Sequence, residues 1–143
     1  MSATLNATPT LSAVEVEISA LFKEFVEGNR GKVLGVAVGD GAGTPLASHF
    51  DQPVNVGRLC TLGVRVLESG AILGECLSLP YPYLAVMKGD RYQMYLWKVN
   101  VVGGPLIGLV KKDGDMDAKF RNLLTKLESI LTPPPPNDFA VTP

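Results

Sequence analysis

The sequence of 143 residues has few of the side chains from which metal and catalytic sites are usually built. His49 is its only histidine, which excludes a multi-histidine metal site. Cys60 and Cys76 are too few for a disulfide scaffold and too far apart for a CxxC motif, which favours a reduced, cytoplasmic protein. No nucleophile–base pair stands out. We therefore predict no catalytic residue, no metal ligand and no cofactor, and expect that the protein is not an enzyme.

The chain also lacks an excess of charge and a long apolar run. Its 13 basic and 14 acidic side chains give a net charge of −1, and neither sign clusters. A nucleic-acid partner would require a basic face, so we expect none. The N-terminus has no basic start before an apolar stretch, unlike a secretory signal. No segment approaches the ~18–20 apolar residues of a membrane span.

Two motif-like segments have ordinary structural explanations. The glycines of residues 39–43 look like part of a GxGxxG loop, but Pro45 and a strand-like segment follow instead of the helix that such a loop requires. Residues 39–45 are therefore predicted to be a hairpin turn. The alternating aspartates of residues 113–117 do not match a calcium-binding loop, which needs DxDxDG spacing and a later glutamate. They are better explained as caps of a final helix, supplied by Asp113 or Asp115.

The remaining pattern predicts an α+β domain. A first helix begins at the capping box Ser12–Glu15 and ends at Gly28. A final helix stops at Pro133. Tyr95 and Trp97 are expected on one sheet face and Tyr92 on the other, since strand side chains alternate. The predicted strands are 32–38, 46–50, 83–88, 91–99 and 105–111, with residues 75–79 as a further short extended piece.

The element order is therefore α-β-β-α-β-β-β-α. Hairpin connections make the sheet five-stranded and antiparallel, with helices on both faces. We expect one folded domain over residues 12–131, a disordered N-terminal segment over residues 1–11 and a proline-rich disordered tail over residues 132–143.

The central helix, residues 55–70, is apolar over roughly 200° of its circumference, whereas a surface helix usually shows little more than about 100°. Asn55 can cap its start. The surplus apolar surface predicts a second partner besides the sheet, either from this chain or from another copy. The predicted dimer-interface residues are Val56, Leu59, Leu62, Gly63, Val66 and Gly70.

The same helix has a narrow polar stripe. Its residues either are simply solvated or border a partner-binding surface, and the sequence favours neither. Cys60 lies on the apolar side and is predicted to be a buried small hydrophobe, while Cys76 is expected in a loop. The candidate partner-binding residues are Arg58, Thr61, Arg65 and Glu68.

Three segments carry a resemblance to a known family: the strand and turn VLGVAVGDGAGTPLAS (33–48), the glycine-bearing helix 56–70 and GPLIGLVKK (104–112). Over residues 14–131 the chain resembles the roadblock / dynein light chain family, which includes a bacterial gliding-motility regulator that partners a Ras-like GTPase. The longer linker 74–82, with its two prolines, departs from the family pattern.

The resemblance implies a homodimer or heterodimer in which the central helices pack together and the two sheets can run on as one. It also implies a non-enzymatic platform for small GTPases, dynein intermediate chains or signalling assemblies. We expect a homodimeric adaptor that binds a small Ras-like GTPase or a motor or signalling complex. The alternatives are a small-molecule sensor of PAS-, GAF- or profilin-like architecture, and a module recognised through its polyproline tail.

Overall fold

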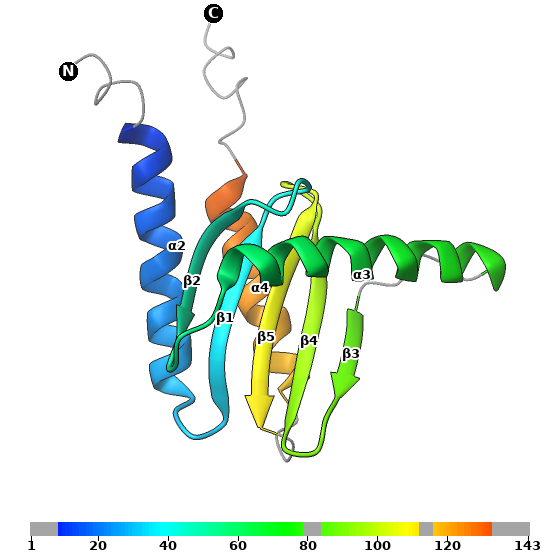
Figure 1. Ribbon diagram of the computed structural model, residues 1–143. Helices are drawn as coiled ribbons and strands as arrows, with labels where there is room; N and C mark the ends of the chain where they lie inside the picture. Colours follow the sequence, from blue (N-terminus) through cyan, green and yellow to red (C-terminus); the bar gives the residue numbers. More distant parts are fainter. Residues whose placement is uncertain (1–8, 79–83, 112–115, 133–143) are drawn as a thin grey trace, which may run out of the picture.

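The computed structural model describes residues 9–78, 84–111 and 116–132. One antiparallel sheet lies between α3 on one face and α2 with α4 on the other (Figure 1). The elements, in chain order, are α2 (Pro9–Gly28), β1 (Val33–Gly39), β2 (Pro45–Phe50), α3 (Val56–Cys76), β3 (Leu84–Lys88), β4 (Tyr92–Val99), β5 (Gly104–Lys111) and α4 (Asp117–Leu131).

The five strands are arranged in the order β2-β1-β5-β4-β3, and every neighbouring pair is antiparallel. β1 pairs with β5, so the first hairpin and the last three strands join at the centre of one sheet. This confirms the predicted fold class. It also leaves β2 and β3 as the two edge strands.

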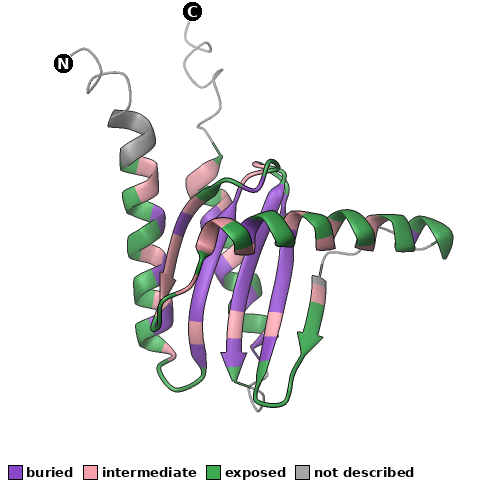
Figure 2. Ribbon diagram, viewed as in Figure 1, coloured by how far each residue is buried: buried purple, intermediate pink, exposed green. Residues whose placement is uncertain are grey.

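The face that carries α2 and α4 holds an aromatic core. The ring of Phe120 on α4 stacks on Trp97 at a centroid distance of 4.9 Å and on Tyr95 at 5.6 Å. Phe25 of α2 meets Phe120 edge-on at 5.0 Å. Tyr95 and Trp97 share a face as predicted, and the central strands are almost wholly buried (Figure 2).

The other face carries α3, which crosses the strands (Figure 1). Asn55 caps this helix, because its side-chain oxygen accepts a hydrogen bond from the Arg58 backbone N–H at 3.1 Å. The predicted cap is confirmed. The predicted end of the helix is wrong, since α3 continues past Gly70 to Cys76.

A glycine inside a helix costs only about 1 kcal/mol relative to alanine. Ala71, Leu73 and Glu75 are good helix formers, and α3 continues through them and through a second glycine at position 74. Consequently Glu75 and Cys76 are helical, not part of an extended piece, and Cys76 is not in a loop.

Two other helix ends also differ from the sequence expectation. α2 begins at Pro9, before the predicted cap Ser12, and proline suits a first helical turn because its missing N–H has no partner there. The N-cap residue of α4 is Met116, whose side chain makes no capping bond, so neither Asp113 nor Asp115 takes that position. Those two aspartates lie outside the described residues, as do residues 1–8 of the segment 1–11 and residues 133–143 of the tail 132–143, both of which were predicted to be disordered. Residues 9–11 belong to α2.

Among the described residues, no helix is both long and apolar enough to cross a membrane.

Gly104 gives a test of how tightly the two turns at one end of the sheet pack. A Cβ at Gly104 would overlap the carbonyl oxygen of Gly39 and the backbone of Asp40. We expect Gly104→Ala to lower the free energy of unfolding by about 3 kcal/mol, as overpacking does when the obstacle is backbone. Urea denaturation measures the change.

Gly28→Ala is the matched control, because a Cβ there meets nothing within 4 Å. It should leave the free energy of unfolding unchanged or raise it by about 0.5 kcal/mol. Equal stability of the two variants would contradict the packing described for Gly104.

Candidate protein interface

α3 lies close to the sheet because its contact positions are small. A Cβ at Gly63 would lie 2.9 Å from Cδ1 of Ile107 and 3.1 Å from Cγ of Pro105. One turn earlier, Cys60 packs against Gly39, where an added Cβ would come within 2.9 Å of the Cys60 Cβ. The chain's own sheet thus accounts for the glycine at position 63.

The predicted dimer-interface residues divide accordingly. Gly63 is buried on the sheet, whereas Leu62 is 42% exposed. The others are half-buried along the flanks of α3, where the sheet covers only one side of each; these are Val56, Leu59, Val66 and Gly70.

The far end of α3 extends beyond β3, the edge strand that it passes over (Figure 1). Three large apolar side chains in this overhanging end, Ile72, Leu73 and Leu77, are 60–65% exposed. Figure 2 shows the last turns of the helix largely in the colour of exposed residues. Sequence reasoning missed these residues because it ended the helix at Gly70, although the apolar run after that glycine was a visible signal.

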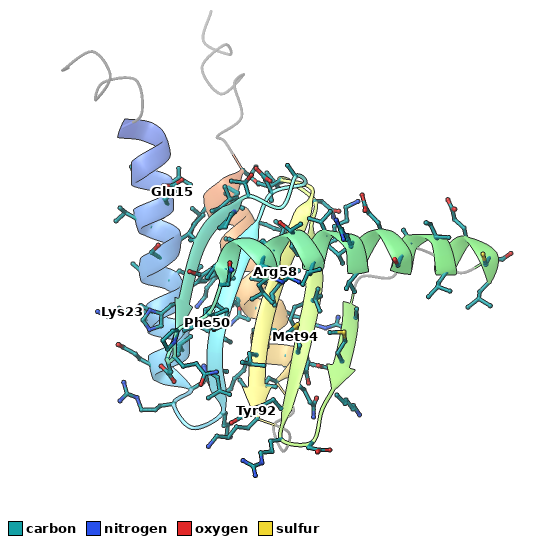
Figure 3. The ribbon with its side chains drawn as sticks, viewed as in Figure 1. Glu15, Lys23, Phe50, Arg58, Tyr92 and Met94 are labelled. Atoms are coloured by element: carbon teal, nitrogen blue, oxygen red, sulfur yellow. The ribbon has the colours of Figure 1, made fainter. Side chains whose placement is uncertain are left out.

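Below α3, the same sheet face carries an apolar row that crosses all five strands. Phe50 pairs with Gly35 and lies against it, since a Cβ at Gly35 would overlap the Phe50 ring. Figure 3 shows Phe50 and Met94 on the side of the sheet that carries α3. In register order the row is Phe50, Gly35, Leu109, Met94 and Met87.

This apolar row is incompletely covered. Leu109 and Met94 are half-buried, and Met87, at its β3 end, is 48% exposed. The row could not be predicted from the sequence, because the β1–β5 pairing of distant segments determines which side chains align.

β3 also offers a free backbone edge. Among the described strands it pairs only with β4, and its single charged side chain is Lys88 at the end. The opposite edge strand, β2, is packed against α2. An unpaired edge is a template for another strand unless it is blocked. The overhanging end of α3, the exposed end of the apolar row and the free edge therefore all occur at the same side of the molecule.

The predicted partner-binding residues form an exposed polar stripe on α3. Arg58, Thr61, Arg65 and Glu68 are all exposed. The Thr61 hydroxyl donates a hydrogen bond to the Gly57 carbonyl at 2.9 Å, and Figure 3 shows Arg58 on α3 above the apolar row. The stripe thus places two exposed arginines next to partly exposed apolar side chains of α3 and of the sheet. Such a combination of arginine and apolar surface suits the binding of a protein.

The glycine-rich turn after β1 is a hairpin, as predicted. A carboxylate oxygen of Asp40 accepts hydrogen bonds from the backbone N–H groups of Ala42 and Thr44, each at 2.9 Å, and strand β2 follows. Cys60 lies beneath this turn, and burial together with the negative charge of Asp40 raises the pKa of its thiol to about 11. A thiol in this state is a protonated packing group, not a nucleophile.

Among the described residues, no three or more His, Cys, Asp or Glu side chains gather in a way that could hold a metal ion. His49 is half-buried on β2 and pairs in register with Val36.

No family model matches the chain, and a search of curated proteins found no match. Among solved structures it is similar to MglB from Myxococcus xanthus, with a TM-score of 0.71 and 12% identity over 84% of this chain and 93% of that one. It is also similar to the gliding protein MglB from Thermus thermophilus, with a TM-score of 0.68 and 18% identity over 83% and 91% of the two chains.

A Roadblock/LC7 domain from Streptomyces avermitilis is similar with a TM-score of 0.62 and 14% identity, over 79% of this chain and 90% of that one. The chain therefore has the roadblock fold, which confirms the resemblance read from its sequence.

The two cysteines give a test of the packing beneath α3. In the folded protein Cys76 is exposed and Cys60 is buried with its pKa raised to about 11. At pH 8 we expect a thiol reagent such as Ellman's to modify Cys76 within seconds to minutes and Cys60 only after denaturant is added, because the reacting species is the thiolate. Two thiols that react at the same rate without denaturant would contradict the burial of Cys60.

Proposed function

We propose that this roadblock-fold chain is a homodimeric, non-catalytic adaptor of the cytoplasm that binds a small Ras-like GTPase. The observation that supports the proposed dimer most is the exposure of two large apolar side chains at the end of α3, Leu73 and Leu77, on the side of the molecule where β3 has a free edge. A folded monomer gains nothing from large apolar side chains held in water at the end of a helix. A second copy of the chain supplies a cover for them.

A two-fold axis perpendicular to the sheet, placed beside β3, brings the two β3 strands together as an antiparallel pair. This operation keeps both copies of α3 on the same face of a continuous sheet and makes them antiparallel. The free backbone N–H and C=O groups of each β3 edge then pair with those of β3 in the other copy. This is the self-complementary arrangement of an isologous dimer.

The length of the overhanging end fits this arrangement. Residues 70–76 form seven residues of helix, which at 1.5 Å per residue span roughly 10 Å. Neighbouring strands are about 4.8 Å apart, so this end reaches over roughly two strands of the partner, β3 and β4. The exposed Met87 and the half-buried Met94 lie on those strands on the face that carries α3. The exposed leucines of one copy thereby meet the open end of the apolar row of the other.

The GTPase part of the proposal is supported by the resemblance of the sequence to the roadblock family and by the fold that the chain shares with MglB. One similar structure is described as MglB in a tetrameric arrangement, with a TM-score of 0.69, which is in keeping with self-association. In the proposed dimer the polar stripe of Arg58, Thr61, Arg65 and Glu68 borders the paired helices. A GTPase seated there would be regulated by complementarity to one of its nucleotide states.

The dimer is tested by placing a charge on the overhanging end of α3. We expect Leu73→Asp and Leu77→Asp each to convert the protein from a dimer to a monomer in size-exclusion chromatography with light scattering. A carboxylate buried between the two helices without a partner would cost several kcal/mol. In the monomer both side chains are already exposed, so the fold should survive.

Val16→Asp is the matched control, because Val16 is an equally exposed apolar residue on α2, away from the proposed interface. It should leave the dimer intact. A wild-type protein that is monomeric at micromolar concentration would contradict the proposed dimer. If both α3 variants remain dimeric, the dimer interface lies elsewhere.

The GTPase partner is tested with a panel of purified Ras-like GTPases loaded with GDP or a GTP analogue. We expect one nucleotide state of one GTPase to be retained by the dimer, and the double variant Arg58→Glu with Arg65→Glu to weaken that binding at least tenfold without dissociating the dimer. Lys23→Glu, a charge reversal on the opposite helix layer (Figure 3), should bind normally. Equal retention of the GTPase by the double variant and by the unmodified chain would contradict this role of the stripe. Equal retention of the GDP-bound and GTP-analogue-bound states would contradict it as well.

A further inference from the structure

The helix layer opposite α3 contains a cleft that the proposed function does not use. α2 and α4 contact each other across the back of the sheet, and α4 ends at the end of the molecule where α2 begins (Figure 1). The hollow between them has a volume of about 340 Å³. It is lined by Leu21, Glu24, Phe25, Gly28, Asn29, Lys119, Asn122, Leu123 and Lys126.

The cleft has an apolar floor. Leu21 and Phe25 of α2 are half-buried, and Leu123 of α4 is buried. Phe25 is also tied to the aromatic core, since its ring meets Phe120 at 5.0 Å. The floor therefore presents an apolar surface that one aromatic or large aliphatic side chain would cover.

The rim of the cleft is more basic than acidic. Lys119 and Lys126 lie seven residues apart on α4, which places them about 10.5 Å apart along one side of that helix. Lys119 is held in place, because its ammonium group donates a hydrogen bond to Oδ1 of Asn29 at 2.8 Å while Nδ2 of Asn29 donates to the Phe25 carbonyl at 2.8 Å. Glu24 is the one carboxylate of the lining. An occupant with an acidic group beside an aromatic one would suit this rim and floor.

We propose that this cleft is a binding site for a proline-rich segment that ends in an acidic and an aromatic residue, and that its occupant is residues 133–139 of this chain. The sequence directly after α4 and Thr132 is four prolines followed by Asn137, Asp138 and Phe139. Prolines in a row cannot continue a helix and favour an extended conformation.

The reach of this segment matches the distance along α4 from Thr132 to Lys119. An extended proline-rich chain rises about 3.1 Å per residue, roughly twice the 1.5 Å of an α-helix. If the segment folds back along α4 from Thr132, each of its residues passes about two helical residues. Asp138, the sixth residue, then lies about twelve positions back along the helix, beside Lys119. In this register Pro136 and Asn137 pass the floor at Leu123, and Phe139 follows next to Asp138 at the end of the floor formed by Phe25.

The proposal is independent of the dimer and of the GTPase. The cleft lies on the α2 and α4 layer, whereas α3 and the edge of β3 lie on the other side or at the end of the sheet. Failure of one proposal therefore leaves the other untouched.

Nuclear magnetic resonance on the full chain tests the docked segment. Residues 137–139 have backbone N–H groups, and we expect their order parameters to be near 0.8, whereas a free tail gives values below about 0.6. Phe139→Ala should lower these values below about 0.6 and shift the amide signals of Phe25 and Leu123. Order parameters below about 0.6 in the unmodified chain would overturn the proposal.

A charge swap identifies the partner of the acidic residue. Lys119→Asp and Asp138→Lys should each release the segment, and the double variant should restore its order because the pair is re-formed with exchanged charges. Arg121→Glu is the matched control, since Arg121 is exposed on α4 and is not part of the cleft lining.

If both single variants leave the segment ordered, or if its order depends on protein concentration, the occupant is not this chain's own segment in this cleft. Dispersed amide signals from the sheet in every variant confirm that the fold is intact, so the result cannot be attributed to unfolding.

Discussion

The close approach of α3 to the sheet is the contact on which the rest of this face depends. Gly63 lies over Pro105 and Ile107, and Cys60 lies over Gly39, with no room for an additional carbon between them. Because the helix is held by these small residues near its start, its direction across the strands is determined there. The helix is long, so its far end extends past β3 (Figure 1). A larger residue at position 63 would lift the helix and remove the geometry that the proposed dimer uses.

Helices cover the two faces of the sheet to different extents. On one face, α2 and α4 enclose an aromatic cluster in which Phe120 stacks on Tyr95 and Trp97. On the other, a single helix crosses the strands and leaves an apolar row from Phe50 to Met87 partly open. The larger buried cluster thus lies on the first face, while the second has exposed apolar surface, which the proposed dimer would cover. The basic-rimmed cleft between α2 and α4 adds a separate surface, whose proposed occupant belongs to the same chain.

Much of the fold was predictable because its signals are local. The asparagine cap at Asn55, the turn at residues 39–45 and the alternation of Tyr95 and Trp97 each depend on neighbouring residues, and each prediction is confirmed. The candidate interface was harder to predict from the sequence. A helical wheel identifies the apolar arc of α3 but cannot say which part faces the chain's own sheet, so Gly63 was grouped with exposed Leu62.

The remaining differences come from weak local preferences and from distant pairing. Gly70 is a plausible helix end, yet its cost is about 1 kcal/mol, which the following residues outweigh. The exposed leucines at positions 73 and 77 were missed for that reason. The apolar row exists only because β1 pairs with β5, a contact between segments about 70 residues apart that no local periodicity encodes.

The central claim is that the overhanging end of α3 lies on the sheet of a second copy. An isotope-filtered NOE experiment on a mixture of differently methyl-labelled chains measures this directly. The account predicts cross-peaks between the methyl groups of Leu73 or Leu77 in one copy and the methyl group of Met87 or Met94 in the other. A protein whose Leu73 and Met87 methyl groups show no intermolecular cross-peak at concentrations where it is dimeric would contradict it.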